Sequence, residues 1–268
     1  MQAISLHSLV PVRTEPQESA EMSTQMLFGE VCTVLREQPR WSYIRLLQDG
    51  QEGWVDAKMI APLSEQEERQ ITAAPYALVV FPMAYAVSEN NGQTIPLTAG
   101  TRLYNYKDGR FEMLGVGFRI DPSMVIEQTL PLNEQNLLQT VRFFLNIPYL
   151  WGGKNAMGMD CSGFTQTVLS LFGRSLQRNA SQQAVQGEPV ESLQNVQAGD
   201  LAFFCKPDSE SKSVTHVGIL IDSARIIHCS GRVKVEKIDP QGIFSVEQAD
   251  AAHPQGKYTH TLLYIRRC

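Results

Sequence analysis

Short runs in which apolar and polar residues alternate dominate the first part of the chain. Val31–Leu35, Trp41–Leu46 and Gly53–Val55 are examples, and turn-forming residues separate them at 38–40 and 48–50. Side chains on a β-strand point alternately to its two faces, so this pattern predicts half-buried strands. Several such strands at close spacing favour a small all-β barrel, which we place at residues 1–63.

A second group of β-type runs follows at residues 75–123. Thr94–Leu97, Thr101–Tyr104 and Gly115–Ile120 belong to it. The preceding stretch, Ser64–Gln70, is charged and polar, which indicates a linker or a short helix. We therefore expect a second small all-β unit behind the first.

The pattern changes after Pro122, where helical spacing of apolar residues replaces alternation. Asn133–Leu145 and Ser162–Phe172 each place their apolar residues on one side of a helix. Helices followed by strands predict an α+β domain, at residues 127–268. Asp222–Ala224 is a short turn that predicts an antiparallel hairpin between two of the strands. The expected strands are Leu201–Cys205, Val217–Ile221, Arg225–His228 and Tyr258–Ile265.

Composition narrows the function classes. Apolar residues make up 43% of the 268 residues, enough for a sizeable core, and the net charge of −5 gives no reason to expect a nucleic-acid partner. No apolar run approaches the roughly 20 residues that span a bilayer. The first twelve residues lack the basic and apolar regions of a secretory signal. We therefore expect a cytoplasmic location, with a periplasmic one as the alternative if a signal peptide was removed.

The five cysteines do not form a recognisable framework. Their number is odd, their spacing is irregular and no CxxC occurs, which disfavours disulfides and zinc ribbons and fits a reducing compartment. Cys32, Cys205 and Cys229 lie in apolar runs and are expected to be small buried residues. Cys268 is the last residue and is expected to be incidental.

Cys161 differs from the other cysteines because it stands at the predicted start of a helix. The positive end of the helix dipole and the free N–H groups there lower a thiol pKa, and the N–H groups can donate to an oxyanion. His216 begins an apolar strand, and His228 lies on the strand paired with it, where it can face His216. One thiol and two imidazoles are the minimum set of groups for nucleophilic attack on an amide.

Two other interpretations of these side chains remain open. A single cysteine at a helix start, or a single histidine on a strand, is more often structural than catalytic. Cys161, His216 and His228 are also ordinary zinc ligands, but no fourth ligand stands out. We expect no metal and no cofactor.

Ordered blocks around these residues carry a family resemblance. The C-terminal part of the chain resembles the NlpC-type papain-like cysteine peptidases over most of residues 130–268, and a match of several blocks in the family's order is highly specific. The matching blocks are Pro148–Gly153, Asp160–Phe164, Arg178–Gln183, Ala198–Phe204, Thr215–Ile219 and Ile226–Ser230.

The resemblance implies a role for each site residue. Cys161 is the nucleophile, His216 is the general base and acid, and His228 orients His216. Tyr149 matches a tyrosine that the family places near the oxyanion. The residues expected on the substrate side are Asp160, Ser162 and, by a looser match, Ser181.

The N-terminal part is similar to bacterial SH3-like domains, through Trp41–Ile44, Asp49–Gly50 and Glu52–Val55. The fold class expected from both resemblances is therefore multidomain, with two small all-β SH3-like barrels followed by an α+β papain-like peptidase domain. In the branch of the peptidase family that this chain resembles, the first barrel closes one end of the active-site cleft. The second barrel lacks the Gly-Trp-Val ending and receives no ligand role. The first-barrel residues expected to wall the pocket are Glu21, Tyr43 and Trp54.

This domain order is similar to the γ-D-glutamyl-L-diamino acid endopeptidases, or dipeptidyl-peptidase VI, which recycle cell-wall peptides. It implies cleavage of the bond between γ-D-glutamate and meso-diaminopimelate or lysine in murein peptides with a free N-terminal L-alanine. Lys154 or Arg178 is a candidate to meet the substrate's carboxylates. The expected partner is this small peptide, with no nucleic acid, no membrane span and a monomeric chain. The alternatives are a surface hydrolase of intact peptidoglycan and a non-catalytic wall-binding protein.

Overall fold

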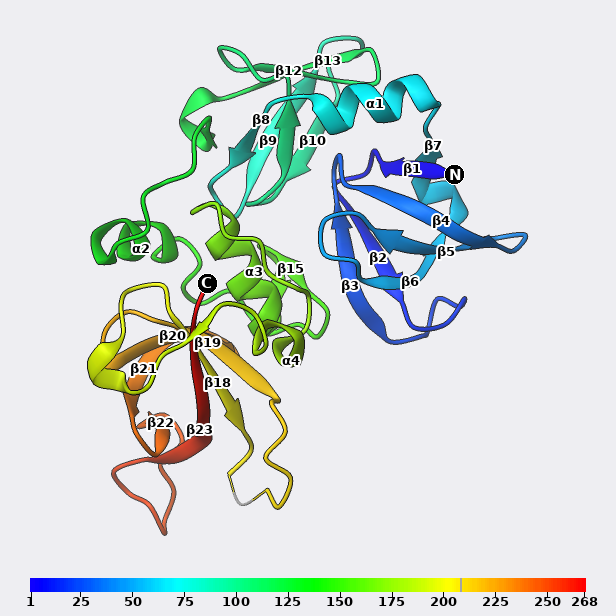
Figure 1. Ribbon diagram of the computed structural model, residues 1–268. Coiled ribbons are helices and arrows are strands. Elements are labelled where there is room, and N and C mark those ends of the chain that lie inside the picture. Colours follow the sequence, from blue (N-terminus) through cyan, green and yellow to red (C-terminus); the bar gives the residue numbers. More distant parts are fainter. Residues whose placement is uncertain (208) are drawn as a thin grey trace. The chain divides into compact units, whose positions relative to one another are not determined.

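The computed structural model describes residues 1–207 and 209–268 and divides into two compact units (Figure 1). The N-terminal unit comprises Met1–Thr129 together with Trp151–Ala156. The C-terminal unit comprises Leu130–Leu150 together with Met157–Cys268. A six-residue piece from the middle of the chain thus belongs, by its contacts, to the N-terminal unit.

The first β group of the N-terminal unit is one antiparallel sheet of seven strands, in the order β3-β2-β6-β5-β4-β1-β7. Val10, Met26, Ile44 and Val55 point inward and form its core. The strands that alternation predicts at 31–35, 41–46 and 53–55 are confirmed. The elements are β1 Gln2–Ser5, β2 Leu9–Arg13, β3 Met22–Leu27, β4 Val31–Glu37, β5 Trp41–Leu46, β6 Glu52–Asp56, η1 Ala57–Met59 and β7 Ile60–Pro62.

The polar stretch after β7 is a helix rather than a linker. Its first turn is held by a capping box, in which Ser64 accepts a hydrogen bond from the Glu67 N–H and the Glu67 carboxylate accepts one from the Ser64 N–H. The elements that follow are α1 Glu65–Ala73, β8 Tyr76–Val79, β9 Ala84–Ser88, β10 Thr94–Leu97, β11 Arg102–Tyr104, β12 Arg110–Met113, β13 Val116–Ile120, η2 Pro122–Met124 and β14 Val125–Ile126.

The second β group consists of a four-stranded sheet, β10-β9-β13-β12, and a three-stranded sheet, β11-β8-β14. It shares a hydrophobic core with the first group, because Phe28 from the first group packs edge-on against Phe111 and Phe118. The two groups therefore form one unit. That residues 75–123 are a second SH3-like barrel stays a prediction.

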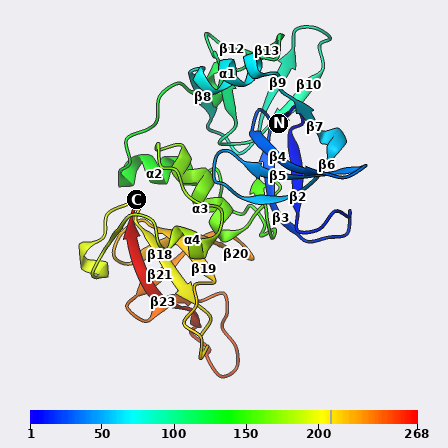
Figure 2. The ribbon, with the colours of Figure 1, turned by 45° about the vertical axis from the view of Figure 1, so that its right-hand side comes forward.

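The C-terminal unit places helices before a closed sheet. Its strand order is β17-β23-β18-β19-β20-β21-β22, and an additional pairing between β22 and β23 closes the sheet on itself. Helix α3 packs against β19 and β20, and β23 runs beside β18 (Figure 2). The elements are α2 Glu134–Val141, β16 Gly158–Met159, α3 Cys161–Ser170, α4 Ala180–Gln183, β17 Glu188–Pro189, η3 Leu193–Asn195, β18 Leu201–Cys205, β19 His216–Leu220, β20 Arg225–Ser230, β21 Arg232–Asp239, β22 Gly242–Ser245 and β23 Lys257–Arg267.

The helix expected over 133–145 is shorter in the structure and ends at Val141. Beyond it the Phe143 N–H bonds to Thr140 and the Phe144 N–H bonds to Val141, so the turns tighten to i→i+3 bonding. These turns keep the Phe144 side chain buried, which explains why the apolar spacing predicts a helix that continues through this residue.

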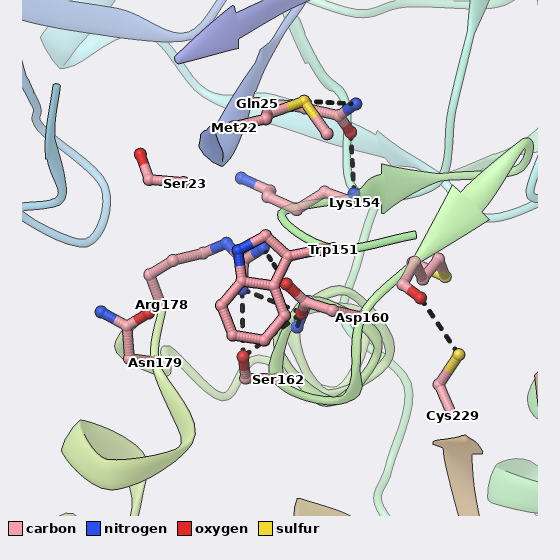
Figure 3. A network of polar contacts seen from close by, with 12 residues as sticks. Met22, Ser23, Gln25, Trp151, Lys154, Asp160, Ser162, Arg178, Asn179 and Cys229 are labelled. Atoms are coloured by element: carbon pink, nitrogen blue, oxygen red, sulfur yellow. Dashed lines mark hydrogen bonds and ion pairs between the residues drawn. The ribbon is translucent and has the colours of Figure 1, made fainter. Parts of the chain in front are cut away.

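The segment Trp151–Ala156, called here the docking segment, includes β15 Lys154–Asn155 and is fixed on β3 and the turn after it. The Lys154 N–H donates to Gln25 Oε1 at 2.8 Å (Figure 3). Gly152 has φ +75°, and a Cβ there would come within 2.3 Å of the Met22 carbonyl oxygen. Lys154 Nζ lies 3.2 Å from Glu30 Oε1, and both side chains are buried. This pair holds the docking segment on the barrel.

We expect Glu30→Gln to lower the free energy of unfolding of the N-terminal unit by about 3 kcal/mol, because it leaves the Lys154 ammonium buried without its counter-charge. All three tryptophans, Trp41, Trp54 and Trp151, belong to this unit, so urea unfolding followed by tryptophan fluorescence measures it. Arg45→Gln, which breaks an exposed pair with Glu52, is the control and should cost less than about 1 kcal/mol. Equal losses in both variants would contradict the prediction.

Candidate active site

Helix α3 begins at Cys161 because Asp160 caps it. The Asp160 side chain accepts a hydrogen bond from the Gly163 N–H at 2.7 Å, which satisfies a donor that the first turn leaves unpaired. Phe164, Val168 and Leu169 are completely buried, so the helix is fixed along its length. Cys161 therefore stands at the positive end of a rigid helix.

Arg178 fixes the Asp160 carboxylate from the other side. Its guanidinium donates to Asp160 Oδ1 at 3.0 Å and to Asp160 Oδ2 at 2.6 Å, and a further bond of 3.0 Å reaches Ser162 Oγ (Figure 3). Arg178 is 1% exposed. A buried bidentate pair of this kind is geometrically specific, so it fixes the residues on both sides of Cys161.

The Cys161 thiol is buried against the beginning of β19. Burial and the negative charge of Asp160 raise the pKa of the thiol to about 11, although hydrogen bonds from the backbone of Val217 and Ser162 lower it. The sequence-based expectation that the helix start lowers this pKa is therefore wrong, because burial outweighs the helix dipole, and at neutral pH the group is a thiol. It needs a neighbouring base to remove its proton when it attacks.

His216 begins β19, and its imidazole faces that of His228 on the neighbouring strand. Strands β19 and β20 pair antiparallel as the hairpin prediction requires, and His216 Nε2 lies 2.8 Å from His228 Nδ1. Burial lowers the pKa of both imidazoles below 6.5, that of His216 well below. Both rings are neutral at pH 7, so His216 is able to accept a proton.

Three polar residues around these histidines were not predicted from the sequence. Glu236 Oε2 lies 2.8 Å from His228 Nε2, and Lys234 Nζ lies 3.2 Å from Glu236 Oε1. The His260 ring stacks on His216 with centroids 4.2 Å apart. Alternation within β21 predicts the opposite arrangement, with Val235 inward and the charged residues toward solvent. In the structure Val235 is exposed, and Lys234 and Glu236 share the face that points inward.

Tyr149 and Ser181 also belong to the C-terminal unit. Tyr149 is half-buried; burial, followed by the charges of Cys161 and Asp160, raises the pKa of its phenol. The backbone N–H of Tyr149 bonds to the Gly231 carbonyl at 2.9 Å. Ser181 is exposed on the short helix α4.

The three first-barrel candidates lie in the N-terminal unit. Glu21 is exposed and accepts a hydrogen bond of 2.6 Å from Trp151 Nε1. Tyr43 and Trp54 pack against each other with ring centroids 5.1 Å apart, and the Arg36 guanidinium lies 4.4 Å from the Tyr43 ring centroid. The two aromatic rings are therefore tilted against each other, and both lie beside the Arg36 guanidinium.

The structure corrects the expectation for the two cations considered for the substrate's carboxylates. Lys154 pairs with Glu30, and Arg178 pairs with Asp160, and each pair is buried. Each positive charge is already balanced by a carboxylate of the protein.

Within residues 1–207 and 209–268, no group of three or more His, Cys, Asp and Glu side chains is arranged to hold a metal ion. In the same residues no helix has the length and apolar character that crossing a bilayer requires. All five cysteines are free, and Cys32, Cys205 and Cys229 are buried, as predicted.

The buried imidazoles predict that the free energy of unfolding falls as the pH is lowered from 7 to 5. Burial lowers the pKa of His260 from 6.5 to about 4, so the unfolded chain binds a proton before the folded one does. The contribution of the neutral His260 to the free energy of unfolding is fully present above pH 6.5 and is lost as the pH falls. At pH 5 the loss from His260 alone is about 2 kcal/mol.

Urea unfolding followed by circular dichroism at pH 7 and pH 5 measures this effect. His260→Phe keeps a ring against His216 but does not titrate, so its stability should depend less on pH. His253→Gln replaces an exposed imidazole and is the control. The same pH dependence in both variants would refute the assignment to buried histidines.

Two family models match the chain. Residues 146–252 match the NlpC/P60 family, and residues 12–60 match the bacterial dipeptidyl-peptidase Sh3 domain. A γ-D-glutamyl-L-lysine dipeptidyl-peptidase of Bacillus subtilis is 29% identical over 222 residues, which are 77% of this chain and 72% of the relative. Dipeptidyl-peptidase 6 of Lysinibacillus sphaericus is 24% identical, covering 90% of this chain and 93% of the relative.

Solved structures share the fold. An NlpC/P60 family protein from Bacillus cereus superposes with a TM-score of 0.81 at 20% identity and covers 100% of this chain and 99% of its own. An NlpC/P60 endopeptidase from Photobacterium damselae superposes with a TM-score of 0.68 at 17% identity, covering 98% of this chain and 65% of its own. The multidomain architecture is therefore that of an SH3-like domain followed by an NlpC/P60 peptidase domain with a C-terminal barrel.

Proposed function

We propose that this chain, which carries an NlpC/P60 domain behind a bacterial dipeptidyl-peptidase SH3 domain, is a cysteine endopeptidase that hydrolyses the γ-D-glutamyl-L-diamino acid bond of murein peptides. One observation carries the catalytic part of the proposal. Cys161 begins a capped helix beside β19, and the histidine that begins β19 is hydrogen-bonded to His228.

The chemistry follows from the protonation states of these groups. As Cys161 Sγ attacks the scissile carbonyl carbon, the thiol proton passes to the neutral imidazole of His216. The negative charge moves to the carbonyl oxygen, where N–H groups of the first turn of α3 and the Tyr149 hydroxyl are the proposed donors. His216 then protonates the leaving amine, and a thioester remains on Cys161. A water molecule, deprotonated by His216, hydrolyses this thioester and restores the thiol.

The names of the relatives support the substrate. Two of them, from Bacillus subtilis and Bacillus cereus, are γ-D-glutamyl-L-lysine dipeptidyl-peptidases. We propose that this chain releases L-Ala-D-Glu from a short peptide with a free N-terminal L-alanine and either lysine or meso-diaminopimelate beyond the cut. Glu21 supplies an exposed carboxylate for the amine. The other proposed pocket residues are Asp160, Ser162, Ser181, Tyr43 and Trp54.

Peptide recycling in the cytoplasm by a monomer, with a second SH3-like barrel at residues 75–123, completes the proposal. The five free cysteines are compatible with a reducing compartment. The alternatives, a surface hydrolase of intact wall and a non-catalytic wall-binding protein, both require binding to intact peptidoglycan. Co-sedimentation with purified sacculi therefore discriminates them from an enzyme that acts on soluble peptides.

We expect Cys161→Ala to abolish cleavage of L-Ala-γ-D-Glu-L-Lys and of its meso-diaminopimelate counterpart, because no other group supplies the proposed nucleophile. Product release measured by chromatography and mass spectrometry tests this. Cys205→Ala removes a buried thiol from β18 and is the matched control, which should retain activity. Undiminished turnover by Cys161→Ala would reject the mechanism.

Acetylation of the substrate's N-terminal amine should reduce kcat/KM by about 100-fold, because the positive charge of the amine and its proposed charge-assisted hydrogen bond to Glu21 are lost. The same assay with free and acetylated peptides measures it. Glu21→Gln should lower kcat/KM for the free peptide, so that the values for the free and the acetylated peptide differ less than with the unaltered protein. Equal rates for both peptides with the unaltered protein would reject recognition of the amine.

A further inference from the structure

The histidine pair of the site continues into a buried row of charged groups on β21. His228 Nε2 lies 2.8 Å from Glu236 Oε2, and the His228 and Glu236 side chains are 0% and 7% exposed. On the other side of the carboxylate, Lys234 Nζ lies 3.2 Å from Glu236 Oε1. His228 thus lies between Glu236 and the proposed base, His216.

Register explains why these groups meet. Strands β20 and β21 pair antiparallel, with His228 opposite Lys234 and Ile226 opposite Glu236. Residues directly opposite each other, and residues two apart on one strand, point to the same face of a sheet. The carboxylate and the ammonium therefore lie on the face that carries the imidazoles.

The carboxylate determines where the protons of both histidines lie. An ionised carboxylate only accepts hydrogen bonds, so His228 must donate from Nε2. His228 is neutral, so its Nδ1 carries a lone pair and accepts the 2.8 Å hydrogen bond from His216 Nε2. The proton of His216 is then on Nε2, which leaves the lone pair of His216 on Nδ1.

The charge has a second effect during the reaction. When His216 takes the proton of the thiol, an imidazolium forms in a buried place next to His228 and His260. Buried charge is costly unless it is paired, and Glu236 supplies a negative charge one imidazole away. Lys234 offsets part of this charge and is itself shared with the partly exposed Glu247, at 3.2 Å.

We propose that Glu236 is a positioning residue of the active site, which selects the proton arrangement that makes His216 Nδ1 the base and stabilises the imidazolium that His216 becomes. Glu236 touches no reacting atom and acts through His228. This role rests on the proposed function of Cys161 and His216 but not on the identity of the peptide.

The first test reads the protons directly. In protein labelled with ¹⁵N-histidine, ring ¹⁵N shifts and their correlations to the ring protons at pH 7 distinguish the two tautomers, and His→Gln variants assign the five histidines. We expect the Nε2–H form for His216 and His228 in the unaltered protein. Glu236→Leu removes the acceptor and should move both to the Nδ1–H form. Glu247→Gln removes a carboxylate from the same lysine without touching His228 and is the matched control.

The second test measures reactivity without the peptide. Alkylation of Cys161 by iodoacetamide at pH 7, followed by peptide mass spectrometry, should slow by about 100-fold in Glu236→Leu and stay within twofold in Glu247→Gln. Wild-type tautomers, or an alkylation rate within twofold of the unaltered protein, in a folded Glu236→Leu would overturn the proposal.

Glu236→Gln tests the same proposal if the leucine variant does not fold. Its amide oxygen still accepts from His228, so the tautomers should persist while the charge is lost. The alkylation rate should fall about 10-fold, and its acid limb should move to lower pH, because a missing negative charge lowers the pKa of the imidazoles. An acid limb at the wild-type pH would overturn the proposal.

The outcomes also separate this proposal from the proposed function. If the tautomers and alkylation rates behave as expected but the murein peptides are not cleaved, the substrate is wrong and the role of Glu236 stands. If the peptides are cleaved but Glu236→Leu keeps the wild-type tautomers and rates, the role of Glu236 is wrong and the peptidase stands.

Discussion

The bidentate pair between Arg178 and Asp160 is the interaction on which the site depends. A buried carboxylate and a buried guanidinium are each costly alone, so each requires the other in one geometry. Because the same carboxylate caps α3 through the Gly163 N–H, the pair also determines at which residue the helix begins. The position of Cys161 against β19 follows from that beginning, and the partners of its thiol follow from that position.

Buried ion pairs occur in both units, and each fixes the position or orientation of a neighbouring part of the chain. Lys154 and Glu30 hold the docking segment on the barrel, whereas Arg178 and Asp160 orient the start of α3. Glu236 and His228 order the protons of the histidines. Apolar packing does not favour one hydrogen-bond pattern over another. The buried ion pairs do, because their hydrogen bonds form in only one geometry.

Much of this arrangement could be predicted from local patterns in the sequence. Alternation predicts β4, β5 and β6, and the short turn at 222–224 predicts the hairpin that brings His216 to His228. The role of β21 could not be predicted, because its buried Lys234 and Glu236 resemble the solvent side of a strand. Only the register of β20 and β21 turns these charges toward the imidazoles, and register is a long-range property of the sheet.

The docking segment has a consequence for how this protein could be cut or recombined. The chain leaves the C-terminal unit at Leu150, binds the barrel, and returns at Met157, four residues before Cys161. A fragment that starts at residue 127, where the sequence suggests a boundary, would keep Lys154 and lose Glu30. Grafting the peptidase part onto another barrel would require that barrel to supply partners equivalent to Gln25 and Glu30 as well. A recombined protein should therefore keep the barrel together with the segment that it holds.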